Sequence, residues 1–140
     1  EKYRQRISGP LLDRIDIHVE VPLVEYRELA SNESGETSAA VRERVEAARA
    51  RQLQRFSGHG NVTCNAAMPS KMMREHCKID ATASGYLEHA MNELNFSARA
   101  HDRILKVART LADLAHSEAI LPEHVLEAIQ YRALDRKLMM

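Results

Sequence analysis

Two arginines in this 140-residue chain stand where a guanidinium could bind an anion. Arg99 lies two residues after Ser97, a residue type that often caps helices, so we expect it in the first turn of a helix. Free backbone N–H groups at a helix start, together with a guanidinium, suit phosphate or carboxylate. The positive end of the helix dipole makes a cation there slightly unfavourable, which favours a role other than helix stability. An ordinary solvated arginine remains the alternative.

Arg14 is the second candidate, on a tight apolar turn formed by residues 11–15. A glycine and a proline break the preceding stretch, and a strand pattern follows the turn directly. An arginine held rigidly near a strand end can reach phosphates bound by a neighbouring subunit, as arginine fingers do in phosphoryl transfer. The alternative is a structural ion pair of Arg14 with Asp13 or Asp16.

Metal binding is less well supported by the sequence. The nearest cluster of possible ligands is His59, Cys64, His76 and Cys77. Adjacent residues on a helix project about 100° apart, so His76 and Cys77 would not share a metal ion easily. No Cys-x-x-Cys pair occurs either. We therefore predict no metal site.

Independent catalysis is not expected from residues 1–140. The chain lacks a glycine-rich phosphate loop of the Gly-x4-Gly-Lys-Ser/Thr type. It also shows neither paired carboxylates nor a nucleophile beside its base in a recognisable pattern. We expect no cofactor to be bound by these residues alone.

The composition limits the possible partners and the cellular compartment. Twenty basic and twenty acidic side chains cancel, so no net field favours nucleic acid or a membrane surface. The absence of Trp and an aromatic content of 4% argue against a stacking platform for single strands and favour a mostly helical fold. No apolar run approaches the roughly 18 residues of a membrane span, and no signal peptide is visible. Two cysteines are too few for a disulfide framework, which predicts a cytoplasmic protein.

Apolar residues at spacings of three and four predict a bundle of five helices. The strongest lies between Ser97 and Ala115, with Ile104, Ala108 and Leu111 on one apolar stripe. We predict the other four helices from Thr37 or Ser38 to about Phe56, from Pro69 or Ser70 to His76, from Asp80 to Leu94 and from Pro122 to Leu134.

The first of these helices has two contrasting faces. Its arginine-rich face reads as a solvated, salt-bridged surface, with a nucleic-acid or partner surface as the alternative. The buried side is expected to hold Val41, Val45, Ala48, Leu53 and Phe56, and the arginine-rich face holds Arg42, Arg44, Arg49, Arg51 and Arg55.

Residues 15–21 alternate apolar and polar side chains, which predicts a strand with one buried face that stops at Pro22. A single strand needs partners, and residues 61–64 are the only other weak candidate. We therefore expect the chain to be part of a longer protein whose sheet lies upstream. Without that sheet, residues 1–34 should pack irregularly.

Four segments carry a specific family resemblance: residues 8–21, which include Leu11-Leu12-Asp13-Arg14, and residues 35–45, 94–115 and 127–132. Together they resemble the C-terminal part of bacterial magnesium-chelatase-like AAA+ ATPases of the ComM/YifB type. The likeness covers nearly all of the chain. It implies a mainly α fold, in which a helical lid bundle follows the last turn and strand of an α/β nucleotide-binding core. The implied boundaries are 1–22 for the end of the core, 23–35 for a linker and 36–140 for the lid.

The resemblance also implies roles for the two arginines. By matching motifs, Arg14 would be the arginine finger presented to the ATP of the adjacent subunit. Arg99, in Ser97-Ala98-Arg99, would be the sensor-2 arginine, which reports on the nucleotide phosphates from the lid. Ile15 stands where many relatives have an aromatic residue, a departure that leaves Arg14 unaffected.

The same resemblance implies a setting for the full-length parent. ATP and Mg2+ would bind to a homo-oligomeric ring, expected to be a hexamer, and the family is associated with DNA branch migration during natural transformation. Residues 1–140 alone are expected to be monomeric. One rival hypothesis is a helical interaction or regulatory module whose arginines only form salt bridges. Another is a DNA-binding domain that uses the arginine-rich face, against which the neutral net charge counts.

Overall fold

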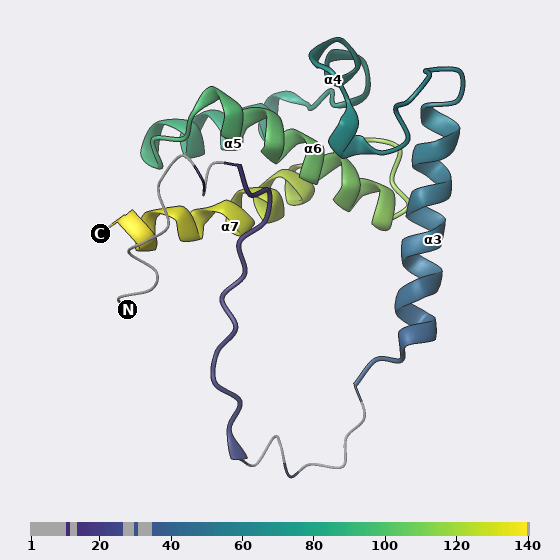
Figure 1. Cartoon of the computed structure of the whole chain (residues 1–140). Helices are drawn as coiled ribbons and strands as arrows, with labels where there is room; N and C mark the ends of the chain where they lie inside the picture. The colour runs from purple at the N-terminus through teal and green to yellow at the C-terminus, as the bar shows by residue number, and fades with distance from the viewer. Residues whose placement is uncertain (1–10, 12–13, 27–29, 31–34, 140) are drawn as a thin grey trace.

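The computed structural model describes residues 11, 14–26, 30 and 35–139, and these are mainly helical (Figure 1). Within this part of the chain, none of the helices is both long and apolar enough to cross a membrane. The elements are α3 (Ser38–Arg55), the 3-10 turn η2 (Asn65–Ala67), α4 (Ser70–His76), α5 (Ala81–Glu93), α6 (Ala98–Leu114) and α7 (Pro122–Met139). The five predicted helices are confirmed.

Side-chain caps fix where three of the helices begin. At each start, an oxygen of the residue before the helix accepts a hydrogen bond from a backbone N–H of the first turn, which would otherwise lack an acceptor. The bonds run from Ala40 N to Thr37 Oγ1 (3.3 Å), from Ala83 N to Asp80 Oδ1 (2.7 Å) and from Ala100 N to Ser97 Oγ (3.2 Å). These predicted caps are confirmed.

A residue with left-handed backbone dihedral angles follows the end of α5 and of α6. His116 has φ 56°, and the next N–H, that of Ser117, returns to the carbonyl of Ala112 at 2.8 Å. Asn95 has φ 46° and has the same place after α5. Such a reversal satisfies carbonyls at the helix end and turns the chain sharply. After α5 it brings the chain directly into the start of α6.

The core is built around α6, which contacts α3, α4, α7 and η2, whereas α5 packs on α7 (Figure 1). Ile104, Ala108 and Ala112 of α6 and Val125 of α7 are all fully buried. Burying a branched apolar side chain such as Ile104 or Val125 stabilises a fold by about 1.5–3 kcal/mol. The N-terminal turn of α6, which carries Arg99, is therefore attached to the best-packed element of the bundle.

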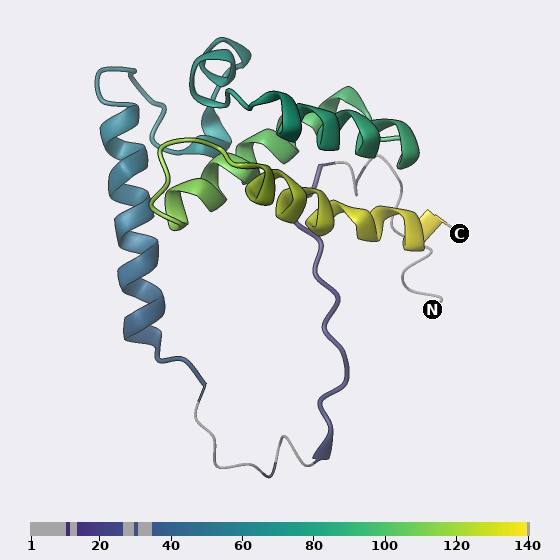
Figure 2. The same cartoon turned by 180° about the vertical axis from the view of Figure 1, so that it is seen from behind.

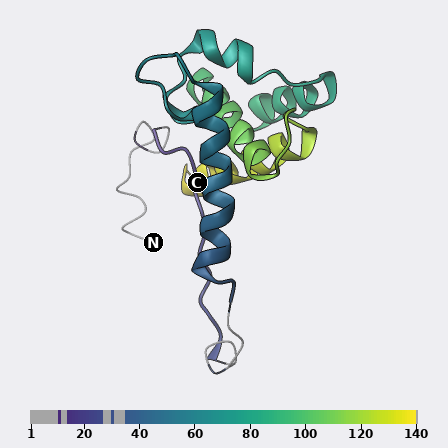
Figure 3. The ribbon, with the colours of Figure 1, turned by 90° about the vertical axis from the view of Figure 1, so that its right-hand side faces the viewer.

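Helix α3 departs from the prediction in the burial of its first half. Ala48 and Phe56 are 3% exposed, as expected, but Val41 and Val45 are about 40% exposed (39% and 43%) and Leu53 is 56% exposed. For the first half of α3, Figure 3 shows the reason, because that part extends well beyond the other helices, whereas Leu53 lies in the last turn. The prediction of a continuous buried stripe is therefore wrong. Nothing in the described part of the chain packs over its first turns.

Residues 14–26 form an extended arm that runs away from the helices in the same general direction as α3 (Figures 1 and 2). The strand predicted over residues 15–21 is wrong for this structure, because the described residues contain no strand and only one isolated bridge, Ile79 to Ile120. A strand needs a paired neighbour, and the arm contacts helices instead. Residues 61–64 also lie outside any strand. The division at 1–22, 23–35 and 36–140 stays a prediction.

Candidate functional site

Arg99 occupies the second position of α6, and its side chain is exposed. It makes no hydrogen bond or ion pair with the residues that the structure describes. Ser97 caps the N–H of Ala100, and helix geometry leaves the N–H groups of Ala98 and Arg99 without intrahelical acceptors. A guanidinium and free N–H groups therefore face solvent at the positive end of one helix. This arrangement fits a phosphate or carboxylate that comes from outside the described chain.

Arg14 lies on a closed turn, in which its backbone N–H donates to the carbonyl of Leu11 at 3.0 Å. Its side chain is exposed. Of the two carboxylates considered as its partners, Asp13 lies outside the described residues. Asp16 forms an ion pair with Arg103 of α6. The turn thus presents Arg14 outward, while the residues just after it contact the bundle.

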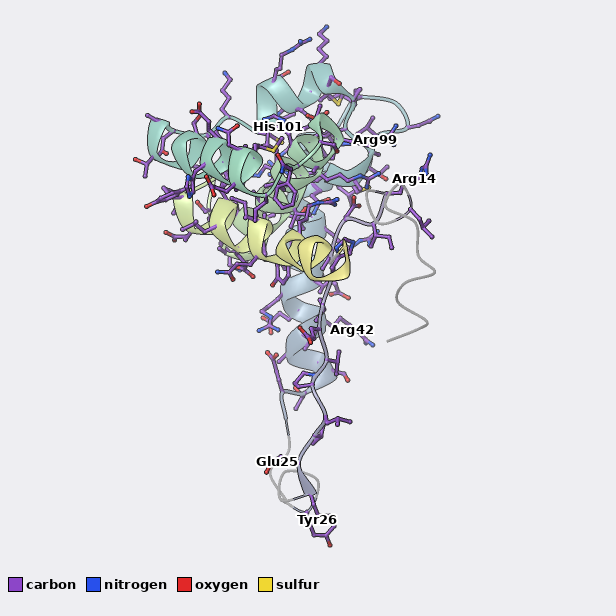
Figure 4. All side chains as sticks on the ribbon, turned by 90° about the vertical axis from the view of Figure 1, so that its left-hand side faces the viewer. Arg14, Glu25, Tyr26, Arg42, Arg99 and His101 are labelled. Carbon is purple, nitrogen blue, oxygen red and sulfur yellow. The ribbon has the colours of Figure 1, made fainter. Side chains whose placement is uncertain are left out.

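The structure brings these two arginines to the same region of the molecule. Arg103, the partner of Asp16, lies one helical turn after Arg99 on the same face of α6. Only one residue, Ile15, separates Asp16 from Arg14. Figure 4 labels both Arg14 and Arg99 on the side where the arm meets the helices. Their proximity could not be read from the sequence, in which 84 intervening residues separate them.

A buried polar network lies at the other end of α6, centred on Asp113, which is fully buried. The Asp113 carboxylate accepts from Arg55 Nη1 (2.8 Å) and from Asn65 Nδ2 (2.8 Å), and Arg109 Nη2 lies 3.3 Å away. Burial by itself raises the pKa of Asp113. The hydrogen bonds from Arg55 and Asn65 outweigh burial, so the pKa of Asp113 lies below its ordinary value.

This network was missed by the sequence analysis, which placed Arg55 on a solvated face. The Arg55 side chain is only 15% exposed and ties the end of α3 to α6. The arginine-rich face therefore divides into two parts: Arg55 is structural, whereas Arg42, Arg44 and Arg49 are exposed. The available signal was Asp113, a charged residue inside the apolar pattern of α6.

Metal binding finds no support among the described residues, in which no three His, Cys, Asp or Glu side chains come together in a group that could hold an ion. Burial raises the pKa of Cys77 to about 11. Its thiol therefore stays protonated near neutral pH and is a weak nucleophile.

Fold and site together define a class, a mainly helical bundle with an exposed arginine in the first turn of α6. Residues 35–132 match the family described as magnesium chelatase, subunit ChlI C-terminal, and residues 1–29 match magnesium chelatase, subunit ChlI. The chain belongs to the magnesium chelatase ChlI C-terminal family and is of the ComM/YifB type.

Individual relatives agree with this assignment. The chain is 44% identical to competence protein ComM of Haemophilus influenzae and 42% identical to the uncharacterized protein YifB of Escherichia coli, each over 138 residues, or 98% of the chain. An uncharacterized protein of Mycobacterium bovis is 34% identical over 131 residues, or 94% of the chain. In each case the match spans 26% of the relative's length.

Proposed function

We propose that this chain is the helical lid of an AAA+ ATPase and supplies Arg14 and Arg99 to ATP hydrolysis between the subunits of a ring. The observation that carries the proposal is Arg99, an exposed guanidinium beside free N–H groups at the start of α6, with no partner in the described residues. Membership of the magnesium chelatase ChlI family supports a nucleotide as the anion.

The two arginines have different roles in this proposal. Arg14 is the arginine finger, which reaches the ATP of the adjacent subunit and stabilises the charge that develops on the transferred phosphoryl group. Arg99 is the sensor-2 residue, which binds the nucleotide phosphates from the lid. ATP and Mg2+ belong to the full-length parent, and closing of the lid couples the state of the phosphates to movement of the ring.

The parent is proposed to be a cytoplasmic, homohexameric motor that acts on DNA. The relative from Haemophilus influenzae is named a competence protein, which supports a role in natural transformation. Branch migration of DNA is the specific activity we propose. No excess of positive charge on residues 1–140 is required for it, because the DNA contacts can be made by other parts of the ring.

Steady-state ATP turnover of the full-length parent tests the proposal. Arg14→Ala should lower kcat by about 10³-fold or more, the usual contribution of an arginine finger. Arg99→Ala should lower kcat and raise KM, since it binds phosphates in the ground state as well. Arg42→Ala is the matched control, because Arg42 is exposed on α3, far from both (Figure 4).

Unchanged turnover in both variants would favour the rival hypothesis of an interaction module. Binding of DNA by residues 1–140 alone, with an affinity that falls steeply with salt, would favour the DNA-binding hypothesis instead. In that case, charge removal at Arg42, Arg44 and Arg49 should weaken binding while turnover stays unchanged.

A further inference from the structure

The segment that carries Arg14 is attached to the helical bundle by a buried arginine. Arg132 of α7 is fully buried, and its Nη1 donates to the carbonyl of Ile15 at 2.7 Å. Ile15 directly follows Arg14 in the chain, and 117 positions separate it from Arg132. A guanidinium keeps its charge when buried, so the loss of a hydrogen-bond partner there is costly. The Ile15 carbonyl is thereby held by a charge-assisted hydrogen bond from inside the bundle.

Two further contacts attach the same segment. The backbone N–H of His18 donates to the carbonyl of Tyr131 at 2.8 Å, which places the arm against the residue next to Arg132. Asp16 forms its ion pair with Arg103 of α6. We call Arg103, Tyr131 and Arg132 the finger clamp. It holds residues 15–18 from two helices.

The position of the clamp matters because of what it connects. Arg103 lies on the helix whose first turn carries Arg99, and Arg132 lies on α7, which packs along α6. A turn held by both helices follows their movements. The arm beyond residue 18 is different, because Val19, Val21 and Leu23 are 67%, 83% and 98% exposed.

We infer that Arg132 is a positioning residue that fixes the Arg14 turn on the helical bundle, so that Arg14 and Arg99 move as one rigid unit. The inference rests on the proposed function for the action of Arg14 on phosphate. The attachment itself does not depend on it. Its consequence is that the Arg14 turn moves with the helical lid, although the expected boundaries assign residues 1–22 to the core, so closing of the lid displaces both arginines.

Amide hydrogen exchange of the 140-residue chain tests the attachment. Arg132→Lys keeps a positive charge but shortens the side chain and loses the planar donor group, so exchange at the His18 amide should accelerate by about tenfold or more. Amides of Ile104 and Ala108 in the core of α6 serve as the internal reference and should not change. Arg42→Lys is the control variant. Equal exchange at His18 in the wild type and in Arg132→Lys would overturn the inference.

A variant that removes a buried arginine can fail to fold, and the exposed half of the clamp provides a second test. Arg103→Asp should speed exchange at residues 15–18 by about two- to fivefold, the effect of a surface ion pair. The double variant Arg103→Asp/Asp16→Arg restores opposite charges and should recover the wild-type rate. Amide exchange at residues 15–18 as fast in the double variant as in Arg103→Asp would overturn the inference.

Turnover of the full-length parent tests the link to Arg14. If Arg132 acts through Arg14, Arg132→Lys alone lowers kcat by about tenfold or more. Added to Arg14→Ala, the same substitution has no further effect on kcat. Multiplied losses in the double variant would contradict the inference. Should Arg14→Ala alone leave turnover unchanged, the proposed function fails, while the exchange experiments still decide whether the clamp exists.

Discussion

Removal of the Asp113 carboxylate should destabilise the chain more than removal of any exposed acidic side chain. Asp113 is fully buried and accepts from Arg55 and Asn65, with Arg109 also within 3.3 Å. Asp113→Ala leaves two guanidinium groups in a partly buried site without their shared anion. The cost comes mainly from these uncompensated charges, because the pair itself contributes less than its Coulomb attraction suggests.

The expected magnitude follows from that arrangement. Breaking a buried ion pair by removing one partner costs about 3–5 kcal/mol, and the low exposure of Asp113 and Arg55 allows little screening by solvent. Each kcal/mol lowers Tm by about 3–4 °C in a domain of this size. Asp113→Ala should therefore lower Tm by about 9–20 °C.

Thermal and urea denaturation followed by circular dichroism provide the assay. Asp102→Ala is the control on the same helix, since the Asp102 side chain is 50% exposed and its loss should change stability by less than about 0.5 kcal/mol. A loss below about 1 kcal/mol for Asp113→Ala would refute the reasoning, because it would mean that the two guanidinium groups find other partners or solvent.

The pH dependence provides a second check on the same carboxylate. The pKa of Asp113 is lower in the folded chain than its ordinary value of 3.8, so the unfolded state binds the proton more readily. Its contribution to stability is fully present above that ordinary value and is lost as pH falls through the lower, folded value. The stability difference between the wild type and Asp113→Ala should therefore shrink in acid. A difference independent of pH down to the acid transition would contradict this assignment.

Two other substitutions and one alkylation reaction test the local structure. Ser97→Ala removes the cap of α6 and should cost about 1 kcal/mol in urea denaturation, whereas a neutral result would mean that water replaces the cap. His116→Gly should stabilise the chain by about 0.5–1 kcal/mol, because His116 has φ 56° and glycine adopts that conformation without strain; a lower Tm would argue against it. Cys77, which is buried with its pKa raised to about 11, should react with a thiol reagent at pH 7.5 far more slowly than the partly exposed Cys64, as mass spectrometry of the alkylated peptides would show.

The helices and their caps could be predicted from the sequence because local interactions determine them. Ser97 and Asp80 are good caps wherever an apolar pattern of helical spacing follows, and both accept from the N–H three residues later. The start of α6, and with it the place of Arg99 in its first turn, depends only on such neighbours. That part of the candidate site was therefore accessible without a structure.

The remaining features depend on contacts between distant segments, and sequence patterns missed them. The strand pattern of residues 15–21 describes which side chains could share a buried face, but a strand forms only when another strand pairs with it. Val41 and Val45 fit a helical stripe, yet a stripe does not determine whether anything covers it. The ion pair of Asp16 with Arg103 joins residues 87 positions apart, and no local rule predicts such a pair.

The projection of α3 has a consequence for how the chain opens. Along residues 38–46 almost every side chain is exposed, so these two to three turns are held mainly by the hydrogen bonds of the helix itself, the Thr37 cap and the surface ion pair of Arg44 with Glu36. The amides there should exchange through local fraying, which costs little free energy and exposes little new surface. The amides near Ala48 and Gln52 should exchange only through larger unfolding events. The helix therefore has a graded stability along its length, lowest at the end farthest from the core.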